Sequence, residues 1–200
     1  MLGIDPTALA EVLARMPLHG GDGTQDRVQG HGFFGAGFLF IGSLLVVETL
    51  AGGVWRRNRL RTMLWPGALI AAGLGMLIVS YAQPTEKSLH LTLAIILLIG
   101  GYFEARYRLG QVPRSAADIV AVPALVLAGI VVGPMHANGP MSSTSAQMHV
   151  LVGLAAFVLA GVRLTQLRYG RTFALDATFG AGVMMMGLSL LLVQQFHAGH

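Results

Sequence analysis

One stretch of the sequence, residues 33–54, reads FFGAGFLFIGSLLVVETLAGGV and contains a single ionisable side chain, Glu48. A spanning helix needs about 20 predominantly apolar residues to cross the hydrocarbon core of a bilayer. This stretch meets that requirement, and five further apolar windows follow it, at residues 63–82, 89–103, 117–135, 148–164 and 173–196. The chain is therefore predicted to cross a membrane six times.

The composition supports the same fold class. Hydrophobic residues make up 54% of the 200 residues and charged residues only 11%, and the mean hydropathy is +0.66. A soluble domain of this size could not bury so much apolar surface. The alternating pattern of a membrane β-barrel is missing from the sequence, which predicts an all-α integral membrane protein with the lipid bilayer as its main partner.

Nucleic-acid binding is not expected despite the net charge of +4. The lack of cysteine excludes disulfides and thiolate chemistry.

The basic residues predict the orientation in the membrane. Ten of the thirteen Lys and Arg residues fall in the first, third and fifth loops, so they lie on one side. The first loop carries Arg56, Arg57, Arg59 and Arg61, the third Arg106, Arg108 and Arg114, and the fifth Arg163, Arg168 and Arg171. The positive-inside rule makes that side cytoplasmic and predicts a multi-pass protein of a bacterial inner membrane with both termini extracytoplasmic. Residues 1–30 are predicted to form an extracytoplasmic tail with a short interfacial helix, and residues 31–200 the transmembrane domain. Four aromatic residues near the Arg loops fit an inner aromatic belt: Trp55, Trp65, Tyr107 and Tyr169.

Histidines recur at a fixed interval. His31, His90 and His149 open the first, third and fifth predicted helices, and each is 59 residues from the next. One helical hairpin fits into each interval, and His136 and His197 occupy matching positions near the ends of the fourth and sixth helices. We therefore expect three parallel hairpin repeats.

These five histidines form the candidate functional site, because they come from five predicted helices at one membrane depth near the outer interface. Buried imidazoles in a bundle are costly without a partner, and neutral imidazole is the commonest metal ligand. Met135, Met141 and Met148 lie beside them, which favours copper, with zinc or haem b as alternatives. The other interpretation is that interfacial histidines bond to loop backbone or lipid headgroups. The predicted metal ligands are His31, His90, His136, His149 and His197.

The acidic residues of the apolar segments lie far from the histidines. They follow or precede them by about 14 to 21 residues, which at 1.5 Å per residue places them near the inner face. We expect them to form ion pairs with the loop arginines, and a proton path is the functional alternative. The four acids are Glu48, Glu104, Asp118 and Asp176.

Several short motifs resemble the transmembrane protein 45 family. Gly30-His31 is followed by Gly35, Phe38 and Gly42 at the offsets found in that family. The resemblance continues to about residue 165 through His90, Pro113, Asp118, His136-Ala137-Asn138-Gly139 and His149. Phe34 stands where the family typically has proline. The resemblance implies a multi-span helical fold with recurring histidines, and it implies no reaction.

Two function classes follow from the sequence. The first is a membrane protein with a histidine-rich transition-metal site at its extracytoplasmic face, used for metal binding, handling or redox. The second is a non-catalytic accessory subunit that packs against a larger membrane complex, or a homo-oligomer, through small-residue stripes. These stripes are Gly129 with Gly133, and Gly35 with Gly37 and Gly42. Whether the protein is an enzyme stays undecided, because no pair of nucleophile and base can be named.

Overall fold

The computed structural model describes residues 23–82, 87–135 and 143–198. The regular structure in these ranges is helical throughout. Each of the six long helices is apolar enough to cross a membrane, which confirms the all-α class and the predicted number of spans. The helices are α2 (Gly23–Arg56), α3 (Arg59–Ala82), α4 (Lys87–Arg108), α5 (Arg114–Ile130), α6 (Ser143–Tyr169) and α7 (Phe173–Ala198), and α5 continues as a π-helical segment, η2 (Val131–Met135).

The first helix begins earlier than the sequence predicts. α2 starts at Gly23, so residues 23–30 of the predicted tail are helical and continue directly into the first span. The predicted interfacial helix falls within residues 1–22, outside the described residues. Near its other end α2 contains Gly52, whose φ of 52° and ψ of −124° are not helical. The helix is therefore kinked close to the first Arg-rich loop.

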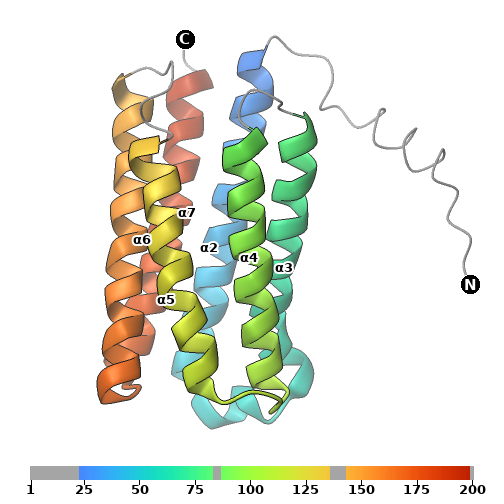
Figure 1. Ribbon diagram of the computed structural model, residues 1–200, viewed down its shortest axis with the longest axis vertical. Helices are drawn as coiled ribbons and strands as arrows, with labels where there is room; N and C mark the ends of the chain where they lie inside the picture. The colour runs from blue at the N-terminus through green and yellow to red at the C-terminus, as the bar shows by residue number, and fades with distance from the viewer. Residues whose placement is uncertain (1–22, 83–86, 136–142, 199–200) are drawn as a thin grey trace, which may run out of the picture.

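The six helices form a closed ring in chain order, in which each packs against its neighbours and α7 packs against α2. Figure 1 shows α2, α4 and α6 running toward one end of the bundle and α3, α5 and α7 returning. We call the end where α2 and α4 finish and α7 begins, the lower end in Figure 1, the charged end, because Glu48, Arg108 and Arg171 lie there by the bounds of these helices. The opposite end, which carries His90 and His149, is the histidine end.

Short capped turns reverse the chain at the charged end. The side-chain oxygen of Asn58 accepts hydrogen bonds from the backbone N–H groups of Leu60 and Arg61 at 3.0 and 3.2 Å, as an N-cap residue does. Gly110 and Gly170 follow α4 and α6 with φ angles of 71° and 87°, which glycine adopts without steric cost. These tight turns keep the neighbouring arginines directly beside the bundle interior.

Glycines bring helix backbones together at three interfaces, α2–α7, α3–α4 and α5–α6. A Cβ added to Gly187 would lie 2.6 Å from the carbonyl oxygen of Gly35, and one added to Gly129 would lie 3.0 Å from that of Gly153. Gly101 is similarly close, at 3.1 Å, to the carbonyl oxygen of Pro66. All three interfaces join one predicted hairpin to the next, and small residues are the usual means of close helix packing in membranes.

The interior of the ring is apolar between the two ends, and the outside is apolar as well. Ile41, Ala94 and Leu159 are 2% exposed or less. Between 22% and 39% of the residues in each spanning window are buried, and many large apolar side chains are exposed. Leu50 and Val158 are examples of this outward surface, which suits contact with lipid chains.

Candidate functional site

An ion-pair network fills the interior of the charged end. It joins four carboxylates to four guanidiniums on α2, α4, α5, α6, α7 and the turn before α7. The predicted pairing of the intramembrane acids with the arginines is therefore confirmed. The members are Glu48, Glu104, Asp118, Asp176, Arg108, Arg114, Arg163 and Arg171.

On the α2 and α4 side the contacts are short. Arg108 donates to Glu48 at 2.6 Å and to Glu104 at 2.9 Å. Glu104 also accepts from Arg114, at 2.6 Å, so this carboxylate ties α4 to the start of α5. Distances of this size are those of charge-assisted hydrogen bonds. These four side chains therefore connect three helices firmly.

Asp118 connects the network to the second half of the ring. It lies 3.0 Å from Arg114, 3.4 Å from Arg163 and 3.8 Å from Arg171. Asp118 and Arg163 are each 3% exposed. A buried charge is tolerated only when it is paired, so Asp118 is the shared counter-charge for guanidiniums on α5, on α6 and before α7.

The α6 and α7 side holds its polar groups less tightly. Gln166 accepts a hydrogen bond from Arg163 at 3.0 Å and donates one to Asp176 at 2.9 Å. Arg171 and Asp176 are 3.3 Å apart. Burial lowers the pKa of Arg171, and the positive charge of Arg114 lowers it further. The second cause means that the positive charges of Arg114 and Arg171 lie close enough to repel each other.

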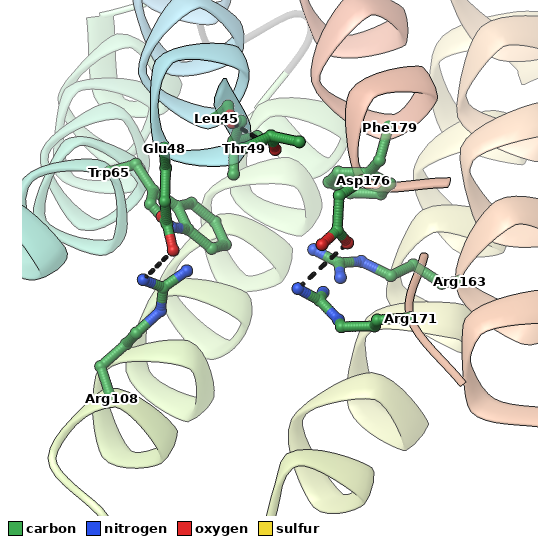
Figure 2. A pocket seen from close by; sticks show the side chains of 9 residues that line it. All are labelled: Leu45, Glu48, Thr49, Trp65, Arg108, Arg163, Arg171, Asp176 and Phe179. Atoms are coloured by element: carbon green, nitrogen blue, oxygen red, sulfur yellow. Dashed lines mark hydrogen bonds and ion pairs between the residues drawn. The ribbon is translucent and has the colours of Figure 1, made fainter. Parts of the chain in front are cut away.

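A small cavity separates the two sides, with Glu48 and Arg108 facing Arg163, Arg171 and Asp176 across it in Figure 2. Its volume is about 20 Å³, which admits about one or two water-sized spheres. Leu45, Thr49, Trp65 and Phe179 complete the lining.

Two sequence predictions at this end are wrong. Trp65 does not belong to an aromatic belt, because it is 5% exposed and its ring lies 5.5 Å from the guanidinium of Arg108. Arg163 is not a loop residue, because it lies inside α6 with its guanidinium 3.8 Å from the ring centre of Phe179. Cation–π contact with an aromatic face offsets part of the cost of burying each guanidinium.

Gln166 is a neutral hydrogen-bond partner of the network that sequence reasoning missed. It is 3% exposed and bridges Arg163 and Asp176 through its two amide atoms. Its position could have been predicted from the sequence, because Gln166 follows Arg163 by three residues on one helix and side chains at that spacing lie on the same face.

The predicted histidine ligands whose side chains the structure describes, His90 and His149, lie at the histidine end. His90 follows the start of α4 at Lys87, and His149 begins a membrane span in α6. His149 is 2% exposed and His90 is half-buried. His31 and His197 lie in the same end portions of α2 and α7, but their side chains are outside the described part of the chain, as is all of His136.

Within the described ranges, no three His, Asp or Glu side chains form a group that could hold a metal ion. Only two of the five predicted histidine ligands, His90 and His149, have described side chains. The proposed ligand set therefore stays a prediction.

Comparison with known proteins adds no assignment to either end. No protein-family model, curated protein or solved structure matches the chain. The resemblance to the transmembrane protein 45 family therefore also stays a prediction.

Proposed function

We propose that this multi-pass membrane protein binds a transition metal at its histidine end, for metal handling or redox at the extracytoplasmic face. The observation that carries the proposal is the burial of His149, which is 2% exposed at the start of a spanning helix. An imidazole buried inside a membrane bundle indicates a functional site by default, because such a side chain is costly to bury there. His90, on a second helix at the same end, supplies a further imidazole.

Copper is the preferred metal, with zinc and haem b next. Met135 and Met148 are adjacent in sequence to His136 and His149, and the chain has no cysteine. A set of imidazole and thioether donors without thiolate favours copper. The full ligand set would be His31, His90, His136, His149 and His197, and direct coordination requires nitrogen–metal distances of about 2.0–2.1 Å for zinc.

Elemental analysis of protein purified in detergent, together with its absorbance spectrum, tests the proposal. We expect bound copper in the wild type, or uptake of added copper, and at least a tenfold loss of affinity in a His149→Ala variant. His19→Ala is the matched control, because His19 belongs to the predicted tail rather than to a spanning helix. A colourless, metal-free protein that takes up neither copper nor zinc would overturn the proposal.

The proposed orientation places the charged end in the cytoplasm and the histidine end outside. The Arg-rich loops support it through the positive-inside rule. In a cysteine-free chain, a single Asn58→Cys or Ser115→Cys variant should react with a membrane-impermeant thiol reagent only after the cytoplasmic side is opened. A Ser143→Cys variant should react in intact cells. The reverse pattern would put the histidines on the cytoplasmic side and remove the extracytoplasmic role.

The three-hairpin repeat belongs to the same proposal. It is supported by the placement of the close glycine contacts, since the α2–α7, α3–α4 and α5–α6 interfaces each join successive hairpins.

The same contacts count against the accessory-subunit alternative. Three glycines of the predicted docking stripes pack against neighbouring helices within the ring: Gly35, Gly42 and Gly129. A Cβ added to Gly37 would have no neighbour within 4 Å. Purification of a stable monomer after mild extraction would disfavour that alternative further.

A further inference from the structure

The turn between α2 and α3 carries positive charge without a carboxylate partner. Arg57, Arg59 and Arg61 are all exposed. Within the part of the chain that the structure describes, none of the three makes an ion pair. The sequence contains no Asp or Glu between Glu48 and Glu86, and Glu48 is buried inside the ion-pair network. The turn therefore has no counter-charge of its own.

The other two Arg-rich regions of the charged end differ from this turn. Most of their arginines belong to the ion-pair network: Arg108, Arg114, Arg163 and Arg171. Of the remaining two, Arg106 on α4 donates to the hydroxyl oxygen of Tyr102 at 3.0 Å. Arg168 on α6 lies 5.9 Å from the ring centre of Tyr169. Exposed positive charge is therefore concentrated at the α2–α3 turn.

Hydrogen bonds fix the backbone of the turn. The N–H of Arg57 donates to the carbonyl oxygen of Gly53 at 3.2 Å, and the side chain of Asn58 accepts from the N–H groups of Leu60 and Arg61. Because the start of α3 is already capped in this way, the guanidinium groups rather than backbone N–H groups are the available donors. A guanidinium has five N–H donors and no acceptor, so its charge favours an anionic hydrogen-bond acceptor as partner.

The turn lies at the depth where a phospholipid carries its phosphate. The first span ends at Trp55 and the second begins at Arg59, so the arginines are at the boundary of the apolar segments. Leu50, Val54 and Leu60 are 68%, 67% and 75% exposed. Positive charge and exposed apolar surface thus adjoin each other here. A ligand that uses both has an anionic headgroup and hydrocarbon chains.

We propose that the α2–α3 turn binds the headgroups of anionic phospholipids through Arg57, Arg59 and Arg61. A guanidinium can donate two parallel hydrogen bonds to a phosphate, and each basic side chain close to an anionic membrane surface strengthens binding by about fivefold. Zwitterionic phospholipids also carry a phosphate, but their own positive group offsets its charge, so a turn without carboxylates favours lipids of net negative charge. The turn lies at the opposite end of the bundle from the histidines, so this proposal does not depend on metal binding.

Trp55 can report on lipid at the turn, because the chain has only two tryptophans and Trp55 is the last residue of the first span. A Trp65→Phe variant leaves Trp55 as the sole fluorophore and keeps an aromatic ring beside Arg108. The protein is reconstituted in vesicles of phosphatidylcholine and phosphatidylglycerol, in which one or the other lipid carries bromine on its acyl chains to quench tryptophan on contact. We expect phosphatidylglycerol to bind beside Trp55 more strongly than phosphatidylcholine, by about fivefold or more. Equal quenching by the two brominated lipids would overturn the proposal.

A Trp55→Phe variant is the matched control, because its sole fluorophore, Trp65, is 5% exposed inside the bundle. The two brominated lipids should quench Trp65 weakly and equally. A preference for phosphatidylglycerol as large as that at Trp55 would mean that the preference is not local to the turn, and would overturn the proposal. Inorganic phosphate at constant ionic strength should leave the preference at Trp55 unchanged, because it has no acyl chains. Displacement of the lipid by phosphate would assign the turn to a soluble anion instead.

Substitution of the arginines in the Trp65→Phe background tests their role. The combined Arg57→Gln, Arg59→Gln and Arg61→Gln variant should bind the two lipids equally. Arg168→Gln should keep the preference, because it removes an exposed arginine of the same end that lies outside the turn. Arg59→Gln is the one-for-one comparison, also if the triple variant does not fold, and it should lower the preference more than Arg168→Gln does. Equal effects of these two single variants, or an unchanged preference in the folded triple variant, would overturn the proposal.

Discussion

At the charged end, eight ionisable side chains are joined by ion pairs inside the bundle, and five of the six spanning helices contribute to them. At the histidine end, the described polar side chains include the buried imidazole of His149 and the half-buried imidazole of His90. A carboxylate or guanidinium removed from water requires an opposite charge close by. A neutral imidazole requires only hydrogen-bond or metal partners. The charged end is therefore suited to fixing helix positions, whereas ligand binding at the histidine end is the function that we propose.

The largest effect is expected from Asp118→Asn. This change removes the carboxylate shared by Arg114, Arg163 and Arg171, and the side chain of Asp118 is only 5% exposed. Removing one partner of a buried ion pair typically costs about 3–5 kcal/mol. Denaturant unfolding in detergent micelles measures the loss. Asp176→Asn, whose side chain is 17% exposed, should cost less. Equal, small effects of the two variants would show that the network does not stabilise the charged end.

A smaller loss is expected from Gly187→Ala, which acts on apolar packing rather than on charge. The added Cβ would lie 2.6 Å from the carbonyl oxygen of Gly35, so α2 and α7 must separate, and overpacking typically costs about 1–3 kcal/mol. Thermal unfolding measures the effect. Gly37→Ala on α2 is the control, because its Cβ would meet nothing within 4 Å. Equal melting temperatures of the two variants would contradict the close α2–α7 interface.

His149→Ala tests the histidine end directly. The side chain is 2% exposed, and loss of a buried hydrogen-bonding group typically costs about 1–3 kcal/mol, so metal-free protein should lose less stability than the Asp118→Asn variant does. Copper should raise the melting temperature of the wild type, because a ligand that binds only the folded state stabilises it. The variant should show a much smaller rise. A larger loss of stability here than in Asp118→Asn would reverse the comparison of the two ends.

The smallest effect is expected from Arg59→Ala. Arg59 is the first residue of α3, at the charged end, and is exposed. Exposed charges contribute little to stability because water and salt screen them, so the unfolding free energy should change by less than about 0.5 kcal/mol. A loss comparable to that of Asp118→Asn would mean that positive charge as such, rather than pairing inside the bundle, stabilises this end.

The sequence predicted the components of the charged end better than their arrangement. Glu48, Glu104, Asp118 and Asp176 were expected to pair with arginines, and they do. Trp65 and Arg163 were assigned to the membrane rim and to a loop, yet both are buried around the cavity. The spacing of aromatic and basic residues along a chain indicates their depth in the membrane. It does not indicate whether they face lipid or the bundle interior.

The sequence by itself determined that the chain has six spanning helices, because a bilayer requires long apolar segments and each one is visible as a window. It also determined that acids in those segments need partners, because lipid cannot solvate a charge. Only the tertiary structure decided which partners they find. Arg108 reaches Glu48 across 60 residues of sequence, and Arg163 reaches Asp118 across 45. Those contacts exist because the helices close into a ring at their glycine interfaces, and such long-range packing leaves no local pattern in the chain.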